Sequence, residues 1–243
     1  MGYDNIKDYR TTRKLIGLSP QELNFDVFFP IYKVLEFQAG YYGLSKSKAK
    51  ERTELLLNQF GLIEKRNSTC RELSGGMKRR LQIAKSLIHD PPILILDEPT
   101  AGVDIELRYL LWDFLKKINQ EGKTILLTTH YIEEAEHLCD RIAIINQGKI
   151  ITDEETNILT EKLGASKILI EYEHNKNTID IKGFQSYIEG KYLVIKTPFP
   201  NKDLPKIMQE LYQQNISVKN IEINKSSLEQ VFIKLTQNET SNK

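Results

Sequence analysis

Two adjacent carboxylates after an uninterrupted apolar run are the strongest sign of chemistry in this sequence. Asp97 and Glu98 directly follow residues 93–96 (ILIL), a run typical of a strand buried on both faces of a parallel sheet. Ligands bind at the carboxyl edge of such sheets. One carboxylate there could hold Mg²⁺ beside phosphate oxygens, and the other could orient or deprotonate a water molecule. Alternatively, residues 97–100 (DEPT) only cap the next helix, and this segment alone does not decide between the two.

Two further expected strands also end in polar side chains. The apolar pattern at 124–129 ends at His130, and a short strand at 15–18 is followed by Gln21. A lone histidine at a strand end is more often a surface residue, but its unperturbed pKa of about 6.5 lets it donate to a phosphate oxygen or orient a carboxylate. An amide can contact both metal and water. Three neighbouring strand ends with these side chains predict a phosphate and metal site.

Residues 73–77 (LSGGM) supply a second possible phosphate contact. Ser74 offers a hydroxyl at the start of an amphipathic helix, and Gly75 and Gly76 let backbone N–H groups approach an anion, which the helix dipole favours. A plain helix cap is the alternative for Ser74, and the pair of glycines argues against it. Residues 78–80 (KRR) are interpreted as a solvated helix face, because three charges on one turn usually face solvent.

The elements that must position these residues alternate between short β-type runs and helical patterns, which predicts a parallel sheet with crossover helices. Helices are expected at 48–60, from Ser74 to Ile88, at 107–118 and at 132–138, and a hairpin is expected at 141–152. Composition shifts near Gly164. Beyond it, strands at 168–172, 192–196 and 217–223 and helices at 203–213 and from Ser226 are expected to form a small α+β unit. We predict two domains, residues 1–164 with a helical subdomain at about 24–90, and residues 165–243.

Composition excludes several other classes of protein. The 34 Lys and Arg against 33 Asp and Glu give a net charge of +1, which argues against a dominant nucleic-acid surface. No run approaches the ~18 apolar residues of a membrane-spanning helix, and residues 1–8 have no apolar core of a signal peptide. Cys70 and Cys139, the only cysteines, share no close spacing, so a disulfide scaffold and a CxxC site are excluded. A cytoplasmic, reduced compartment fits best.

Taken together, the motifs resemble those of the nucleotide-binding subunit of an ATP-binding-cassette (ABC) transporter. Five of them occur in the order of that family: the glutamine loop 19–22, the signature 73–77, the Walker B run 93–97 with Glu98, the aspartate loop 101–104 and the switch residue His130. The resemblance implies an α/β fold, the P-loop-NTPase-like ABC cassette with a mostly parallel sheet and a helical signature subdomain. Residues 165–243 are similar to the C-terminal extension of multidrug or ABC-2-type export ATPases.

The resemblance also implies a role for each polar residue at the strand ends. Asp97 and Gln21 would serve Mg²⁺, Glu98 would be the general base for the attacking water, and His130 would contact the γ-phosphate of ATP. The chain would then be an ABC-type ATPase whose cofactors are ATP and Mg²⁺.

In the dimer that the resemblance implies, the signature serves the opposite subunit. Ser74, Gly75 and Gly76 would contact ATP held by a second ABC cassette, either a copy of this chain or a full-length partner, and Asp104 would lie at the dimer interface. The other partner would be a membrane permease, with no nucleic acid involved, and the subunit would lie in the cytoplasm on the inner face of the cell membrane.

The family's Walker A loop, G-x-x-x-x-G-K-[ST], has no match in these 243 residues. Residues 122–124 (GKT) match only in part, because Lys117 stands where the first glycine belongs. Residues 1–4 resemble the segment after the Walker A helix, so we interpret the chain as N-terminally truncated. The Walker A strand and helix, and sheet beside residues 93–96, are expected to be absent. Alone, the chain is expected to bind ATP poorly.

Three classes of function are compatible with this family. The first is the motor subunit of an exporter, in which the aromatic segment from Phe25 to Tyr42 would receive the permease, or else form the core of the helical subdomain. The second is a non-hydrolytic or regulatory cassette that supplies only the signature half of an ATP site. The third, a chromosome or DNA-repair ATPase, is disfavoured, because only 51 residues separate Gln21 from Leu73 and leave no room for a long coiled coil.

Overall fold

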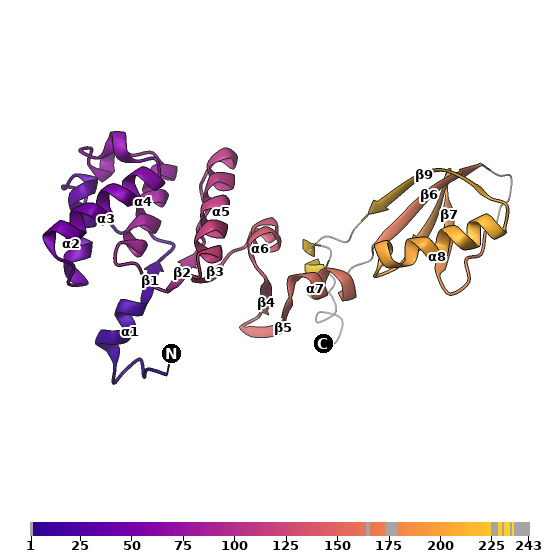
Figure 1. The fold of residues 1–243 in the computed structure, drawn as a ribbon, viewed down its shortest axis with the longest axis horizontal. Helices are drawn as coiled ribbons and strands as arrows, with labels where there is room; N and C mark the ends of the chain where they lie inside the picture. The colour runs from indigo at the N-terminus through magenta and orange to yellow at the C-terminus, as the bar shows by residue number, and fades with distance from the viewer. Residues whose placement is uncertain are drawn as a thin grey trace. The chain divides into compact units, whose positions relative to one another are not determined.

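The structure is a computed structural model that describes residues 2–163, 166–173, 179–224, 228–229, 231–233 and 235. The chain forms two compact units, Met1–Tyr131 and Ile132–Lys243, which are treated separately below (Figure 1). The domain boundary expected near residue 164 lies inside the second unit and stays a prediction. No helix in the described ranges is long and apolar enough to cross a membrane.

A three-stranded parallel sheet forms the base of the first unit. Its strands are β1 (Ile16–Ser19), β2 (Ile93–Asp97) and β3 (Thr124–Thr128), in the order β1-β2-β3. Ile93 in β2 lies opposite Ile16 in β1 and opposite Thr124 in β3. The parallel sheet is therefore confirmed, but the expectation that sheet beside residues 93–96 is absent is wrong, since β2 pairs along both of its edges.

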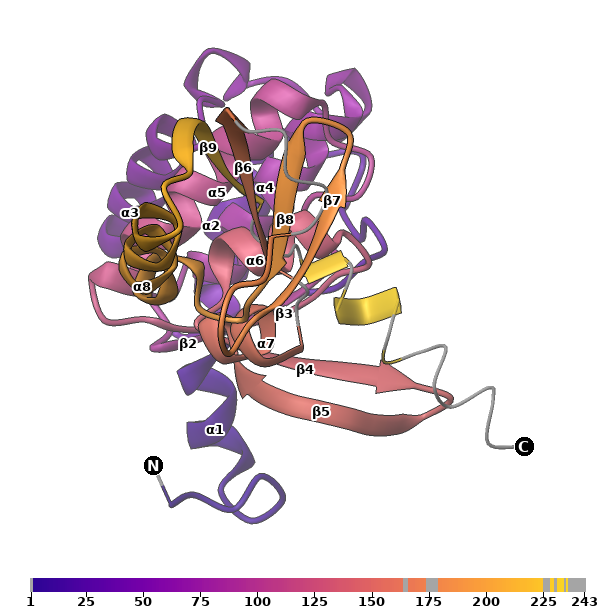
Figure 2. The same ribbon diagram turned by 90° about the vertical axis from the view of Figure 1, so that its right-hand side faces the viewer.

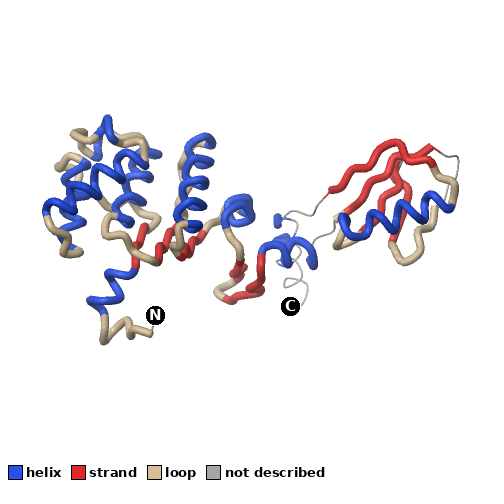
Figure 3. Tube along the Cα trace, viewed as in Figure 1, coloured by secondary structure: helices blue, strands red, loops and turns tan. Residues whose placement is uncertain are grey.

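Helices dominate the rest of the first unit, as the blue segments of Figure 3 show. Between β1 and β2 the chain forms α2, α3 and α4, whose buried faces meet around the fully buried Leu35, Leu57 and Leu81. This stretch is the expected helical subdomain. The helices of the unit are α1 (Tyr9–Leu15), α2 (Ile31–Tyr41), α3 (Lys46–Gln59), α4 (Gly75–Leu87) and α5 (Ile105–Gln120), with 3₁₀ turns at Ile63–Lys65 and Cys70–Glu72.

The sheet packs tightly on α4 through one face only. Leu94 and Leu96 are fully buried, whereas Ile93 and Ile95 on the other face of β2 are half-buried, so the expectation of a strand buried on both faces is not met. Burying each leucine contributes about 1.5–3 kcal/mol. The contact is closest at Gly17, where a Cβ atom would lie 2.3 Å from the carbonyl oxygen of Ser86. Only glycine allows α4 to approach β1 this closely.

The second unit begins with helix α6 and a β-hairpin. Figure 2 shows the hairpin as two adjacent strands, β4 (Arg141–Asn146) and β5 (Lys149–Glu155), as expected. Gln147 and Gly148 form its turn with φ of 48° and 76°, the positive angles that a two-residue hairpin turn requires. Helices α6 (Ile132–Leu138) and α7 (Thr156–Leu163) flank the hairpin in sequence.

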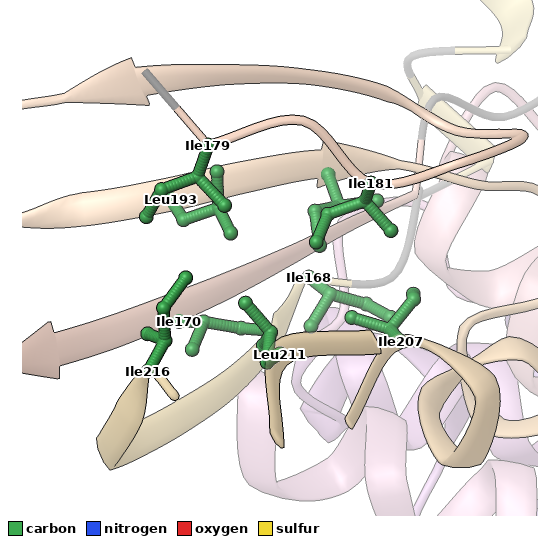
Figure 4. Packing of buried hydrophobic residues seen from close by; sticks show 9 residues of the cluster. Ile168, Ile170, Ile179, Ile181, Leu193, Ile207, Leu211 and Ile216 are labelled. Carbon is green, nitrogen blue, oxygen red and sulfur yellow. The ribbon is translucent and has the colours of Figure 1, made fainter. Parts of the chain in front are cut away.

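A four-stranded antiparallel sheet with one helix follows. Its strands, in the order β7-β8-β6-β9, are β6 (Lys167–Glu173), β7 (Gln185–Glu189), β8 (Tyr192–Lys196) and β9 (Ser217–Asn224), and the helix is α8 (Pro200–Gln213). Figure 4 shows Ile207 and Leu211 of α8 facing Ile168 and Ile170 of β6, which makes the α+β core that the sequence predicts. Only β7 was not expected, because its alternating polar residues carry a weak apolar signal.

The end of the chain returns to the hairpin. Leu228 and Val231 are buried and pack with Ile142, Ile144 and Leu159 of β4 and α7, in a cluster separate from the core of the four-stranded sheet. The helix expected from Ser226 begins outside the described residues. The described residues beyond β9 therefore contribute to the hairpin core, although they follow the α+β sheet in sequence.

Gly17→Ala tests the close approach of α4 to β1. We expect a loss of about 3 kcal/mol in the free energy of unfolding, because the new methyl group would overlap backbone that cannot move without shifting α4. The measurement is a urea unfolding curve of the whole chain followed by circular dichroism.

Gly40→Ala is the matched control for this substitution. Gly40 lies in α2, and nothing lies within 4 Å of the place that a methyl group would take, so alanine should be neutral or stabilise the helix by up to about 1 kcal/mol. Equal urea midpoints for the two variants would contradict the inferred contact.

Candidate functional site

The carboxyl ends of the three parallel strands align at one edge of the sheet. Ser19 of β1 lies opposite Leu96 of β2, and Asp97 lies opposite Thr128 of β3. Gln21, Asp97 with Glu98, and His130 therefore leave neighbouring strands at corresponding heights. The expectation that three neighbouring strand ends meet at one edge is confirmed; the chemical roles of their side chains stay predictions.

Glu98 and His130 form a direct pair at this edge. The Nδ1 atom of His130 lies 2.7 Å from Oε2 of Glu98, and the His130 side chain is 62% exposed whereas that of Glu98 is 16% exposed. Glu98 also has a φ of 51°, a left-handed conformation that costs a glutamate of order 1 kcal/mol or more. Its N–H donates to the carbonyl of Thr128 at 3.0 Å, which ties this residue to β3.

Asp97 has a different partner and does not cap a helix. The hydroxyl of Thr128 donates to its carboxylate. Helix α5 begins only at Ile105, with Asp104 in the N-cap position, so residues 97–100 are not the cap that the alternative interpretation required. Thr128 was not singled out from the sequence, although its place at the end of an apolar strand beside Asp97 is the signal that could have indicated it.

The donor set at Asp97 fits a magnesium ion that is shared with phosphate. The described residues contain no cluster of three or more His, Cys, Asp or Glu side chains able to hold a metal alone. Mg²⁺ keeps several waters and is usually bound by one or two carboxylates together with substrate phosphates. One carboxylate, oriented by a hydroxyl, at an open sheet edge is compatible with that mode of binding.

The signature segment begins α4 and leaves its first amides open. Ser74 is the N-cap, and its hydroxyl accepts a hydrogen bond from the N–H of Met77 at 3.3 Å, so the plain cap is present. The N–H groups of Gly75 and Gly76 lie in the first helical turn, where no intrahelical acceptor exists. A side chain at Gly76 would press against Leu107 at 3.0 Å, whereas Gly75 is open. Capping and anion binding are therefore both compatible with this segment.

Arg79 contradicts the interpretation of residues 78–80 as a solvated face. It is only 3% exposed, and its guanidinium points into the unit, where it donates to backbone carbonyls of the glutamine loop and of residues 97–99. The signal in the sequence was spacing, because Gly76, Arg79 and Ile83 recur at helical intervals and all three are buried. The charges of residues 78–80 favour a solvent-facing turn, whereas the position of Arg79 in the helical repeat indicates burial.

Two predicted site residues are not joined to the Glu98 and His130 pair. Within residues 2–131, no hydrogen bond links the side chain of Gln21 or of Asp104 to Asp97, Glu98 or His130. Gln21 is exposed and meets the site through its backbone, whose carbonyl accepts from Arg79 at 3.1 Å. Asp104 is exposed at the start of α5. Their predicted roles toward Mg²⁺ and a dimer partner are not tested by this geometry.

Comparison with known proteins agrees with the fold and the order of the motifs. The family model described as ABC transporter matches residues 3–101. Two relatives carry the name Nod factor export ATP-binding protein I. The one from Burkholderia pseudomallei (strain 1710b) is 41% identical over 72% of this chain and 54% of its own length. The one from Rhizobium sp. (strain N33) is 35% identical over 95% of this chain and 75% of its own length.

Solved structures give the same result for the fold. The structure of an ATP-binding subunit of an ABC transporter matches 66% of this chain and 67% of its own, with a TM-score of 0.60 and 27% identity. A dimeric ATP-binding cassette bound to ADP and phosphate matches 64% of this chain and 68% of its own, with a TM-score of 0.57 and 26% identity. The chain spans about half the length of the Burkholderia relative and three quarters of the Rhizobium one. By its similarity to these relatives and by its fold, the chain belongs to the ABC transporter family as an ATP-binding cassette.

Proposed function

We propose that this chain is the ATP-binding subunit of an ABC exporter, which couples ATP binding and hydrolysis to export through a separate membrane permease. The observation that carries the proposal is the pair of Glu98 and His130, 2.7 Å apart, beside Asp97 at the carboxyl edge of a parallel sheet. The names of the relatives support an export function. In this proposal the subunit lies in the cytoplasm against the inner face of the cell membrane.

Each side chain of the edge has a distinct task in this proposal. Asp97, oriented by Thr128, and Gln21 would hold Mg²⁺, which when bound neutralises charge on the phosphates of ATP. Glu98 is placed to accept a proton from an attacking water. If Nδ1 of His130 donates to Glu98, its Nε2 can donate to a phosphate only when the ring carries both protons.

The proposal requires a second cassette. Ser74, Gly75 and Gly76 would contact the γ-phosphate of ATP held mainly by the opposite subunit, and Asp104 would lie between the two subunits. These 243 residues contain no Walker A sequence, whose amides and lysine otherwise provide the main phosphate contacts. We therefore propose that these residues alone are incomplete for catalysis.

Substitution Glu98→Gln tests the general base. When a separately supplied Walker A segment completes the ATP site of this chain, in a complex with a second cassette and a permease, we expect ATP hydrolysis to fall by about 10²-fold or more, because an amide cannot accept the proton of water. The measurement is the rate of phosphate release in reconstituted vesicles, with the chain alone as the reference for incompleteness.

Glu106→Gln, on the exposed first turn of α5, is the matched control and should leave the rate unchanged. If the complex with Glu98→Gln hydrolyses ATP at the wild-type rate, Glu98 is not the general base. Hydrolysis by the chain alone at the rate of the complex would refute its incompleteness.

A second function follows from the intact signature helix. The chain could be a non-hydrolytic cassette that supplies only Ser74, Gly75 and Gly76 to an ATP site on a full-length partner. In that case ATP should promote association with the partner. Ser74→Arg should abolish this association, because it replaces the hydroxyl that would contact phosphate with a bulky side chain. Analytical ultracentrifugation of the mixture with and without Mg-ATP measures this.

Ser45→Arg is the control for that experiment, since Ser45 caps α3 and not the signature helix α4. No ATP-dependent association with the wild-type chain would rule out this function. Association combined with loss of hydrolysis in Glu98→Gln would favour the exporter instead.

The aromatic segment between the glutamine loop and α3 is the proposed permease contact. Phe28 is 76% exposed and Tyr41 is 86% exposed, whereas Val34 and Leu35 of the same segment are buried. The segment therefore contributes both to the core and to the surface. This division agrees with a contact surface held on a packed helix.

Phe28→Glu should reduce co-purification of the permease at least tenfold, because a charge replaces an exposed aromatic ring at the proposed contact. Leu110→Glu, on the exposed face of α5, is the control and should leave the yield unchanged. Unchanged co-purification of Phe28→Glu would assign this ring to the helical subdomain alone.

A further inference from the structure

We propose that Arg79 is a positioning residue, which holds the glutamine loop and the loop that carries Asp97 and Glu98 in a fixed arrangement. It acts through the backbone carbonyls of both loops and touches no reacting atom. Its consequence for catalysis rests on the proposed function, whereas its effect on the two loops does not.

The guanidinium of Arg79 spans the ends of two neighbouring strands. Toward β1, Nη1 donates to the carbonyls of Pro20 at 2.9 Å and Gln21 at 3.1 Å. Toward β2, Nη2 donates to the carbonyls of Asp97 and Glu98. In addition, Nε donates to the carbonyl of Pro99 at 3.0 Å. Five carbonyl acceptors thus surround a group that has five N–H donors.

The geometry of these contacts requires a guanidinium. Neighbouring strands in a sheet lie about 4.8 Å apart, and the planar fork of arginine presents donors on both of its sides. The ammonium of lysine is a compact point charge with three donors, so it cannot reach both strand ends at once. Because Arg79 is 3% exposed, water cannot replace contacts that are lost.

The loop that carries Asp97 and Glu98, here called the second loop, needs such support because Glu98 adopts a strained conformation. Its φ of 51° lies in the left-handed region, which a glutamate adopts only where its surroundings impose it. Arg79 fixes the carbonyl of Glu98, and β3 fixes its N–H through the carbonyl of Thr128 at 3.0 Å. Both backbone groups of Glu98 are therefore held, and its side chain is aimed at His130.

Two more side chains of α4 bind the glutamine loop and the residues directly after it. Nε2 of Gln82 donates to the carbonyls of Pro20 at 2.6 Å and Glu22 at 2.8 Å. Nζ of Lys85 donates to the carbonyl of Asn24 at 3.2 Å, and burial lowers the pKa of this lysine. Side chains at 79, 82 and 85 thus bind carbonyls of residues 20, 21, 22 and 24. Arg79 alone also reaches residues 97–99, and so connects α4 to both loops.

The test measures amide hydrogen exchange in the full chain. The N–H groups of Glu98, Ala101 and Val103 donate to backbone carbonyls in or beside the second loop. In Arg79→Lys and in Arg79→Gln we expect these amides to exchange at least tenfold faster, and chymotrypsin to cleave within residues 23–29 at least tenfold faster. Amides of β6 and β8 should keep their wild-type rates. Lysine should not rescue, because it lacks the fork.

The neighbouring Arg80→Lys is the matched control. Nη1 of Arg80 donates to the carbonyl of Phe60 at 2.6 Å, at the end of α3, so this variant should leave exchange at Glu98 and Ala101 unchanged. Restoration of wild-type exchange in Arg79→Lys would show that only a buried charge is needed, and would overturn the proposal. Faster exchange across all of residues 2–131 would also overturn it, because that pattern is a general loss of stability.

If the Arg79 variants do not fold, amide exchange in the wild-type chain still tests the proposal. Exchange at Glu98, Ala101 and Val103 more than a hundredfold faster than in the middle of α4 would show that the loop is not held. In the assembled complex, Arg79→Lys should lower kcat at least tenfold while KM for Mg-ATP changes less than twofold, and an unchanged kcat would contradict the catalytic consequence. A wild-type complex without ATP hydrolysis would refute the proposed function and leave the exchange result to decide on Arg79.

Discussion

The buried guanidinium of Arg79 is the interaction on which the arrangement of the first unit depends. A charge removed from water costs several kcal/mol unless hydrogen bonds compensate for it. Here the compensation comes from carbonyls of residues 20, 21 and 97–99, at the ends of β1 and β2. The same contacts therefore satisfy the arginine and connect the ends of both strands. Because these carbonyls point toward the guanidinium, they also set the directions in which the two loops leave the strands.

Close packing of α4 on the sheet makes this possible. Gly17 lets the helix approach β1 until the carbonyl of Ser86 lies 2.3 Å from where a Cβ would stand, and seven residues earlier in α4 Arg79 reaches the strand ends. A bulkier residue at 17 would push α4 outward and stretch the bonds of Arg79. The packing of Gly17 against α4 therefore determines whether Arg79 can form its hydrogen bonds at the strand ends. Those hydrogen bonds in turn help to position Glu98. The signature residues Ser74 to Gly76 start the same helix.

Patterns of hydrophobicity predicted the elements well, and the order of the strand ends predicted which polar residues would meet. The strand at Ile93–Asp97 and the helix after Ser74 were found within one residue, because a continuous apolar run and an N-cap are local signals. The expectation that sheet beside that strand is absent was wrong, since which strands pair is decided by tertiary packing. Arg79 was missed for the same reason: its partners lie 18 to 59 residues away, and local composition favoured solvent. Thr128 was missed because a threonine in a strand is ordinary.

The second unit shows how sequence order and packing can diverge. The four-stranded sheet at 167–224 has its own core, built from isoleucines of β6 and leucine and isoleucine of α8. Leu228 and Val231 follow that sheet in sequence but bury themselves against the hairpin that precedes it, and the N–H of Leu228 lies 3.4 Å from a carboxylate oxygen of Glu136 in α6. Residues before and after the four-stranded sheet therefore pack in one core, formed with α6, the hairpin and α7. A segment held at both ends loses less conformational entropy on folding than one held at a single end. The core of the hairpin therefore takes residues from both sides of the boundary that was predicted near 164.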